Sequence, residues 1–531
     1  MKKRAGVVAL ILIPAYVLAG GRGANDRFEQ RLRNISSAEM QAVVEFLGHD
    51  LLEGRSPGSR GGDLAEIYIR SLFKMLDLEP AGTNGYMQPF ILKKFTTSGI
   101  QLVAGDVTLE YIHDLVGTAT CQTPDFNISA PLVFVGFGIR AQKWNWDDYK
   151  DADVSGKILV SRVNDPGSFH PQIFEGKTLT YFGRWTYHIE EAARRKALGI
   201  LLIHTDESAG YGWKVVENSW TNGEFFIPAQ IDNPLVFRGW IKEESLERLL
   251  ASKGVKLADL YRQSLTTEFK PVDLGIQAAI SGRNQWQDVE NRNVVASVSG
   301  KVPQRIVLSA HIDHLGTTNT GGDRIFNGAI DNGSAVAAML VAAKILKEFQ
   351  DDLYYSITVL ACNSEEAGLL GSRFYVDTTD RSNIIANINF ESSPVWKSAT
   401  SLMGIGARFS TFAELIRQTA ADHGLTYSQF SLANQGLFYR SDQFSFARRG
   451  IPAVWISAGE TEVDGERHYT RFWLGDYHTV RDEYDPEWDL GGLRQTIQAA
   501  LRLVRRMNEN RVPPQWKNNL TFPIENEAGE K

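Results

Sequence analysis

Acidic residues and histidines that could bind a metal ion are spaced along the second half of this 531-residue chain, most of them directly after a short apolar run. Imidazole and carboxylate groups are ligands that zinc and similar divalent metals take in proteins. A carboxylate shared by two ions would permit a two-metal site. The segments that carry these residues are 309–316 (SAHIDHLG), 327–334 (NGAIDNGS), 364–368 (SEEAG), Glu391 and 476–479 (DYHT).

The adjacent pair Glu365 and Glu366 suggests a division of labour in hydrolysis. Glu366 could coordinate a metal, while Glu365 could act as the general base that takes a proton from a water molecule. Asp313 follows His311 by two residues and could orient its imidazole ring. A single Glu-Glu pair or a single Asp-Asn-Gly turn is usually only surface structure. Their common placement in the loops of one α/β unit favours a metal hydrolase.

The elements that would position these residues alternate between strands and helices from about residue 290 onward. Nearly continuous apolar strands alternating with helices predict an α/β fold with a mostly parallel central sheet and helices on both faces. Functional residues in such folds lie where strands end. Strands are predicted at 293–298, 305–310, 356–361, 384–390 and 451–456, and helices at 334–349, 410–424 and 490–508.

Two helices are predicted before residue 80. The first lies within 35–50, and a loop at 53–62 (EGRSPGSRGG) separates it from a second helix at 63–76. The 3.6-residue period predicts that Leu64, Tyr68, Leu72 and Met75 form the inward face of the second helix.

A β-rich module interrupts the α/β pattern. Short β-like runs begin near residue 100, and a helix at 189–198 precedes a strand at 200–204. The aromatic stretch 181–185 could contact substrate or pack in a core. The predicted organisation is a catalytic domain at 30–105 and 288–515, an inserted domain at 106–287 and a polar tail at 516–531.

The N-terminus has the pattern of a secretory signal peptide at 1–19: a basic start, MKKR, and an apolar run at 5–19. A helix of that length spans about 22 Å, less than the ~30 Å hydrocarbon core. We therefore expect cleavage after Ala19, export to the periplasm or medium, and no stable membrane insertion of the mature chain. A retained anchor is the alternative. No other segment suggests a membrane span.

Composition excludes several other classes. The chain has two cysteines, Cys121 and Cys362, which excludes a disulfide framework, and we expect two free, buried thiols. The net charge is −7 without a long basic tract, so nucleic acid is not expected as a partner.

Five ordered segments resemble the secreted co-catalytic zinc aminopeptidase family, which also contains glutamate carboxypeptidase and, more distantly, the glutaminyl cyclases. They read SAHIDHLG, FNGAIDNGSAVAAML, NSEEAGLLGSRFY, RSDQFSFARRGIPAV and DYHTVRDEYD. The early segment LLEGRSPGSRGGDLAEIYI is similar to the N-terminal catalytic part of this family. In the inserted module, APLVFVGFGI, DVSGKILV and EEAARRKALGILLIH resemble a protease-associated domain.

The resemblance implies a site with two zinc ions. One zinc would be held by His311, Asp331 and Glu391, and the other by Asp331, Glu366 and His478, with Asp331 bridging. The family usually has aspartate where this chain has Glu391, so the first zinc could be bound more weakly. His468 is a rival for His478, and His314 is interpreted as a turn residue.

The resemblance also implies the catalytic roles. A hydroxide bridging the metals would attack the peptide carbonyl, and Glu365 would be the base that later protonates the leaving amine. Asp313 would hold His311, and Tyr477 would donate a hydrogen bond to the oxyanion.

The function expected is therefore an exported zinc exopeptidase, most simply an aminopeptidase that removes N-terminal residues from peptide substrates. A carboxypeptidase- or dipeptidase-like relative, a glutaminyl cyclase-like relative and a non-catalytic binding homologue are the alternatives. Residue preference and oligomeric state are left open by the sequence.

Overall fold

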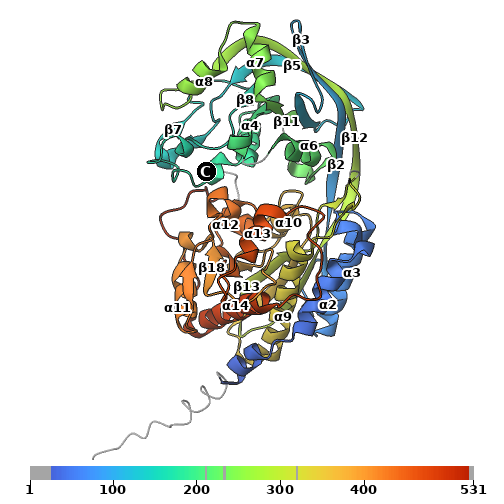
Figure 1. The fold of residues 1–531 in the computed structure, drawn as a ribbon, viewed down its shortest axis with the longest axis vertical. Coiled ribbons are helices and arrows are strands. Elements are labelled where there is room, and N and C mark those ends of the chain that lie inside the picture. The colour runs from blue at the N-terminus through green and yellow to red at the C-terminus, as the bar shows by residue number, and fades with distance from the viewer. Residues whose placement is uncertain (1–25, 210–211, 231–234, 319–320, 526–531) are drawn as a thin grey trace, which may run out of the picture.

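The computed structural model describes residues 26–209, 212–230, 235–318 and 321–525. The predicted signal peptide, 1–19, lies outside the described residues. Figure 1 shows two lobes stacked along the long axis. The lower lobe carries the helices and strands at both ends of the chain, and the upper lobe carries the inserted residues.

Two long strands join the lobes. β2 (Met87–Ala104) and β12 (Val272–Val298) pair antiparallel along most of their length (Figure 1). β12 also pairs with β5 (Asp125–Phe134) in the upper lobe and with β16 (Tyr355–Cys362) in the lower lobe. One 16-stranded sheet therefore runs through both lobes. The insertion is entered and left through paired strands, and its predicted boundary at residue 287 falls inside β12.

The lower part of this sheet is mixed, with a parallel centre. Each neighbouring pair in the order β20-β17-β13-β16 is parallel, while β12 and β18 (Ser401–Ile405) run antiparallel to β16 and β20. The parallel strands besides β16 are β13 (Val302–His311), β17 (Ile384–Asn389) and β20 (Ala453–Ala458). The predicted α/β class, with a mostly parallel central sheet, is confirmed.

Helices cover both faces of the lower sheet, which explains its unbroken apolar strands. On β13, Ile306, Leu308 and Ala310 enter one core, while Val307 enters another on the opposite face. The first core is formed with α2 (Ser37–Leu47), α3 (Arg60–Met75), α9 (Ala335–Glu348) and α14 (Gly491–Asn510), and the second with α10 (Leu370–Thr378) and α12 (Gln443–Arg448).

Helix α3 forms as predicted but buries a different face. Ala65, Ile69 and Phe73 are fully buried, whereas Leu64 is 37% and Met75 80% exposed. The prediction is wrong for Leu64 and Met75, whereas Tyr68 and Leu72 are partly buried against the core. The helix packs against β12, and this contact selects the stripe of Ile69 and Phe73 over the neighbouring one.

In the upper lobe, parallel strands β5, β8 (Ile158–Ser161), β9 (Gly199–His204) and β11 (Phe237–Lys242) follow one another in the sheet. The aromatic stretch predicted at 181–185 packs in a core. Tyr181 and Phe182 are buried, and the Tyr181 ring lies 5.3 Å from that of Phe444 in the lower lobe.

The segment predicted as a polar tail contributes to the lower lobe up to its last described residue. Phe522 is buried among the rings of Phe409, Phe438 and Phe444, and Trp516 Nε1 donates to the Gly450 carbonyl at 2.8 Å. These contacts stabilise the C-terminal segment on the surface that faces the upper lobe.

Two further features bear on the sequence predictions. The prediction that no segment after the N-terminus could cross a membrane is wrong by length and composition, because Ala329–Glu348 is long and apolar enough, but 94% of its most apolar stretch is buried inside the protein. Both cysteines are free, Cys362 buried and Cys121 only half-buried.

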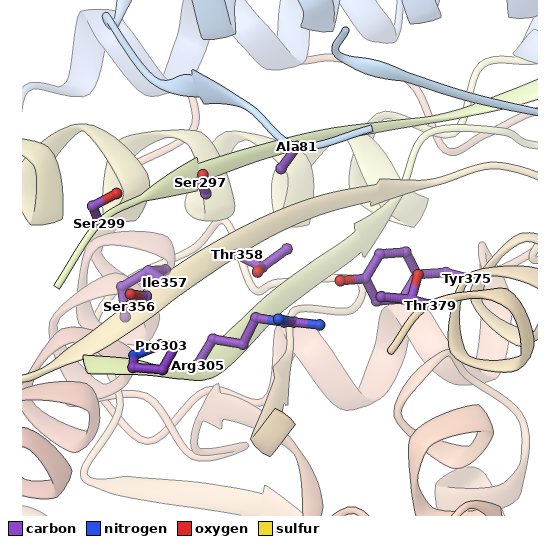
Figure 2. A pocket seen from close by; sticks show the side chains of 10 residues that line it. All are labelled: Ala81, Ser297, Ser299, Pro303, Arg305, Ser356, Ile357, Thr358, Tyr375 and Thr379. Carbon is purple, nitrogen blue, oxygen red and sulfur yellow. The ribbon is translucent and has the colours of Figure 1, made fainter. Parts of the chain in front are cut away.

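A cavity of about 280 Å³, lined by Arg305 and Tyr375, lies at the end of β13 opposite His311 (Figure 2).

Candidate metal centre

The candidate site residues converge at the carboxyl edge of the parallel strands, as strand ends in α/β folds predict. His311 is the last residue of β13, Glu365 and Glu366 follow β16, and Glu391 follows β17. Asp331 lies in the turn that leads into α9, and His478 follows α13 (His468–Gly475).

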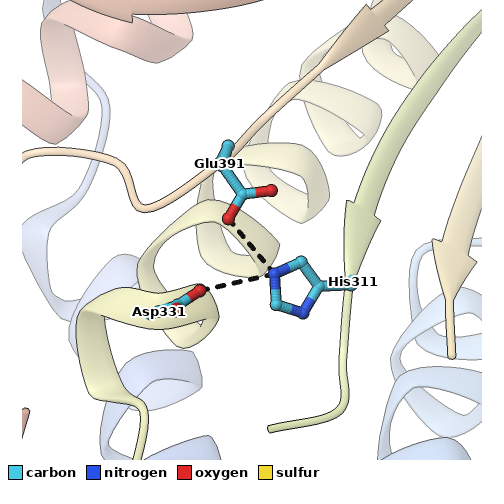
Figure 3. Close-up of side chains that lie close together, drawn as sticks. All are labelled: His311, Asp331 and Glu391. Carbon is cyan, nitrogen blue, oxygen red and sulfur yellow. Dashed lines mark hydrogen bonds and ion pairs between the residues drawn. The ribbon is translucent and has the colours of Figure 1, made fainter. Parts of the chain in front are cut away.

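A first set of candidate ligand atoms surrounds His311 (Figure 3). His311 Nε2 lies 3.1 Å from Glu391 Oε1 and 3.4 Å from Asp331 Oδ1. All three side chains are buried, and their atoms lie close enough together to hold one ion.

A second set surrounds His478. Its Nε2 lies 3.2 Å from Asp331 Oδ2 and 3.2 Å from Glu366 Oε2. Asp331 therefore turns one oxygen to each histidine. This is the arrangement that a carboxylate bridging two ions requires.

These distances fit a metal centre. Ligands at 2.0–2.2 Å around a tetrahedral zinc ion are separated by about 3.3–3.6 Å. Asp331 Oδ2 and His478 Nε2 are also buried without a hydrogen-bond partner among the described residues. Buried charged groups of this kind are usually paired or bound to metal. The site is strongly acidic, with these buried carboxyl groups: Asp313, Asp331, Glu365, Glu391, Asp442 and Asp482.

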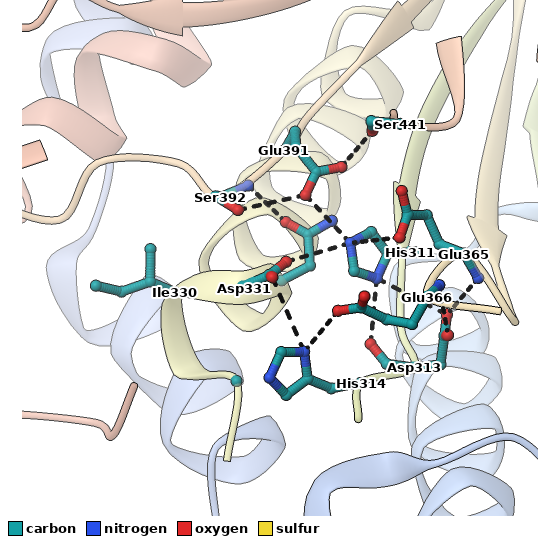
Figure 4. Close-up of polar contacts among 12 residues, drawn as sticks. His311, Asp313, His314, Ile330, Asp331, Glu365, Glu366, Glu391, Ser392 and Ser441 are labelled. Carbon is teal, nitrogen blue, oxygen red and sulfur yellow. Dashed lines mark hydrogen bonds and ion pairs between the residues drawn. The ribbon is translucent and has the colours of Figure 1, made fainter. Parts of the chain in front are cut away.

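Asp313 contacts the site in a way the sequence did not predict (Figure 4). Its main-chain carbonyl oxygen, 3.1 Å away, accepts from His311 Nδ1, whereas its carboxylate is 3.7 Å from that nitrogen. The carboxylate instead accepts the backbone N–H groups of Glu365 at 3.0 Å and Glu366 at 3.2 Å. Asp313 thus links the His311 loop to the Glu365–Glu366 turn.

Asp482 holds the turn that carries Asp331. Its two carboxylate oxygens accept from the backbone N–H groups of Ile330 at 2.7 Å and Asp331 at 2.9 Å. Burial raises the pKa of Asp482 to about 7, against the effect of these hydrogen bonds. This contact fixes the shared carboxylate of Asp331 between the two histidines.

Glu391 reaches His311 in spite of the unusual side-chain length at this position. The hydroxyl of Ser441 donates to Glu391 Oε2, and that of Ser392 donates to Oε1 at 3.3 Å. The extra methylene group therefore does not exclude Glu391 as a ligand.

Glu365 and Tyr477 line one small pocket beside the two donor sets, together with Arg440, Trp455 and Trp473. Glu365 is 8% exposed, and burial raises its pKa well above the usual range although the nearby His311 opposes this shift. Its Oε2 lies 3.9 Å from His311 Nε2, within ion-pair distance but beyond that of a hydrogen bond. The ring of Tyr477 stacks on His478 with centroids 3.9 Å apart.

Of the other two histidines considered from sequence, one lies apart from the donor sets and one lies beside them. His468 bonds to Glu462 at 2.8 Å and stacks on Trp396, apart from both donor sets. His314, interpreted as a turn residue, is fully buried and lies 2.9 Å from Glu366 Oε1.

Sequence reasoning missed two residues that support the site. Ser441 lies in the segment RSDQFSFARRGIPAV, where a serine carries no signal by itself. Arg55 lies in the glycine-rich loop between α2 and α3 and is fully buried. Its guanidinium donates to the carbonyls of Ile312 and Gly328, in the loops that carry His311 and Asp331. A charged residue in such a loop would ordinarily be expected at the surface.

The fold and the donor sets define a class of α/β proteins with candidate metal ligands at the strand ends, and known proteins match part of the chain. Residues 293–504 match the model described as "Peptidase family M28". The segment contains both donor sets.

Curated relatives match over parts of their length. Aminopeptidase YwaD of Bacillus subtilis is 28% identical over 190 residues, 35% of this chain and 37% of the relative. The alkaline phosphatase isozyme conversion protein of Escherichia coli is 30% identical over 127 residues, 22% of this chain and 36% of the relative. The chain thus matches less than two fifths of the length of either relative.

A solved structure titled as an aminopeptidase from Aneurinibacillus sp. strain AM-1 is similar to nearly the whole chain. The TM-score is 0.54 at 18% identity, covering 94% of this chain and 98% of that one. This likeness concerns the fold and includes the upper lobe.

Proposed function

We propose that this chain is an exported zinc aminopeptidase that hydrolyses the N-terminal residue from peptides. The observation that carries the proposal is the position of Asp331, whose two oxygens face the donor sets of His311 and His478. The family match over residues 293–504 and the relatives named as aminopeptidases support the reaction class.

Two zinc ions would be held by the two donor sets. His311 and Glu391 would hold the first, His478 and Glu366 the second, and Asp331 both. When bound, the ions would polarise the peptide carbonyl and lower the pKa of a water molecule toward about 7.

The remaining steps belong to residues of the pocket beside the ions. Glu365 would accept the proton of the attacking water and pass it to the leaving amine. Burial raises the pKa of Glu365, which makes its carboxylate a stronger proton acceptor. Tyr477, in the same pocket, would donate its hydroxyl proton as a hydrogen bond to the oxyanion.

The first experiment is hydrolysis of aminoacyl-p-nitroanilides by the purified chain, with zinc counted before and after chelation. Glu365→Gln should keep its zinc and lose at least about 100-fold in kcat. Glu348→Gln, on the surface and paired with Arg31, is the matched control and should keep full activity. An active Glu365→Gln variant would exclude the proposed base.

The alternatives are distinguished by assays of the same purified chain with other substrates. A carboxypeptidase-like enzyme would cleave N-blocked peptides, and a cyclase-like enzyme would release ammonia from N-terminal glutamine without cleaving the peptide bond. A binding homologue would hold zinc without turnover. Each result would replace the aminopeptidase proposal.

Export is proposed from the basic and apolar N-terminus at 1–19. Expression of the full chain in a bacterial host should yield a mature protein that begins at Gly20, as measured by intact mass. An uncleaved chain in the membrane fraction would favour the retained anchor.

A further inference from the structure

Among the described residues, His314 is a buried histidine beside the two donor sets that the proposed function does not use. It lies in the loop after β13, and its side chain has no exposed surface. Its Nδ1 lies 2.9 Å from Glu366 Oε1, an ordinary hydrogen-bond distance (Figure 4).

The hydrogen bond determines which nitrogen carries the proton. An ionised carboxylate only accepts, so the nitrogen that faces Glu366 must be an N–H donor. His314 Nε2 is buried and has no hydrogen-bond partner among the described residues. A neutral imidazole with its proton on Nδ1 therefore directs its only donor at Glu366.

The two oxygens of Glu366 are thereby given different partners. Oε1 faces His314 at 2.9 Å, and Oε2 faces His478 Nε2 at 3.2 Å. His314 Nδ1 is 3.9 Å from Asp331 Oδ2, farther than His478 Nε2, which is 3.2 Å from the same oxygen. Although His314, Asp331 and Glu366 are close enough to form a ligand set, these distances favour His478 as the ligand and His314 as a donor.

The surrounding backbone fits closely around the imidazole ring. Gly328 has φ +61°, and a Cβ atom at this position would lie 2.6 Å from Cγ and Cδ2 of His314. The backbone N–H of His314 donates to the Arg55 carbonyl at 3.4 Å, and Arg55 Nη2 donates to the Gly328 carbonyl at 3.0 Å. The ring is thus confined between the two loops that carry His311 and Asp331.

We propose that His314 is a positioning residue for the second metal ion: its Nδ1–H holds Oε1 of Glu366, so that Oε2 is aimed at the ion shared with His478 and Asp331. The inference rests on the metal centre of the proposed function but not on its substrate. It predicts that loss of this donor weakens one of the two zinc sites.

The test is zinc affinity, measured on the purified full chain by competition with a chromogenic chelator. His314→Leu keeps the volume but removes the donor, and it should bind one zinc 10–100-fold more weakly and leave the other unchanged. His314→Asn places an amide N–H near the position of Nδ1 and should retain most of the affinity. His314→Gln places it near Nε2 and should behave like His314→Leu.

Controls separate the possible outcomes. His468→Asn changes a histidine outside both donor sets and should bind zinc as the wild type does. Circular dichroism identifies any variant that fails to fold. If His314→Leu does not fold, the zinc affinity of His314→Asn decides whether the Nδ1–H donor supports the second site. If His314→Leu binds both zinc ions with wild-type affinity, the inference about His314 is overturned, while the proposed metal centre is not. A loss in His314→Asn as large as in His314→Leu would also overturn it and indicate direct coordination. A wild type that binds no zinc would overturn the proposed metal centre as well.

Discussion

At the scale of single residues, polar contacts orient several of the candidate ligands. Asp313 holds His311 through its carbonyl, Asp482 holds the Asp331 backbone, and Ser441 holds Glu391. Such supporting contacts orient ligands before the ion arrives. Asp313 also fixes the backbone turn that carries Glu365, the proposed base, and Glu366, the proposed ligand.

Tyr477→Phe tests the oxyanion contact. Removal of one such donor should lower kcat by about 100-fold while KM and zinc content stay near the wild-type values, because the hydroxyl acts on the charge that develops in the transition state. Steady-state kinetics with an aminoacyl anilide measure the effect. Tyr354→Phe, at the opposite end of β16, is the control. An unchanged kcat in Tyr477→Phe would leave Tyr477 only a packing role against Trp473 and His478.

At the scale of elements, the loops after parallel strands carry the site, and Arg55 joins two of them to the α2–α3 connection. Its guanidinium donates to the carbonyls of Leu47, Ile312, Asn327 and Gly328. Burial lowers the pKa of Arg55 to about 10, and the acidic side chains nearby oppose this shift. The guanidinium therefore remains charged at neutral pH, within an otherwise acidic site.

Arg55→Met should destabilise the chain by about 3–5 kcal/mol, because four buried carbonyls lose their donor and the acids lose a cation. Urea unfolding followed by tryptophan fluorescence measures the change. Arg60→Met, on the exposed start of α3, should stay within about 0.5 kcal/mol of the wild type. Equal stabilities of the two variants would contradict the structural role of Arg55.

The C-terminal segment gives a second prediction at this scale. Phe522 is 5% exposed within a cluster of aromatic rings. Phe522→Ala should cost about 3–5 kcal/mol and lower Tm, since a buried aromatic side chain is replaced by a cavity. Phe169→Ala removes a ring that is 50% exposed and should have a smaller effect. The difference in Tm between the two variants decides whether this segment is part of the core.

At the scale of the whole molecule, the two lobes are joined by paired strands and by contacts across their interface. Arg448, on α12, forms ion pairs with Glu190 of the upper lobe at 2.9 Å and with Glu525 of the C-terminal segment. Burial opposes ionisation of Glu190, yet the nearby arginines, Arg448 first, lower its pKa to about 2. This ion pair therefore persists through the acidic range in which most carboxylates are protonated.

His188, in the upper lobe, predicts an acid-dependent loss of stability. Burial lowers the pKa of this histidine to about 4, from about 6.5 in the unfolded chain. Between these values the unfolded chain binds more protons, so stability is complete above about pH 6.5 and falls as the pH drops toward 4. The expected loss is about 3 kcal/mol.

The measurement compares denaturant unfolding of the wild type and His188→Gln from pH 4 to pH 7. The variant lacks the titrating group, so the free-energy difference between the two proteins should change by about 3 kcal/mol over this range. A constant difference would show that His188 is protonated in the folded chain as readily as in the unfolded one.

The sequence by itself predicted the α/β class and named eight candidate ligand or catalytic residues, which the structure brings together in one cluster. Periodicity and the placement of acids after apolar strands are local signals, so they survive without knowledge of the packing. The same local signals placed Leu64 and Met75 of α3 inward, although both are exposed, because only the contact with β12 shows that Ile69 lies at the centre of the buried face.

Tertiary structure alone decided which groups meet. The contact of His314 with Glu366, the burial of Arg55 and the bonds from Asp313 to the Glu365–Glu366 turn each join segments far apart in the chain. No pattern of spacing encodes such a contact, because it depends on the register of neighbouring strands and on the volume left between loops. The length and composition of Ala329–Glu348 would also allow it to cross a membrane, and only its packing in the lower lobe shows that it is a core helix.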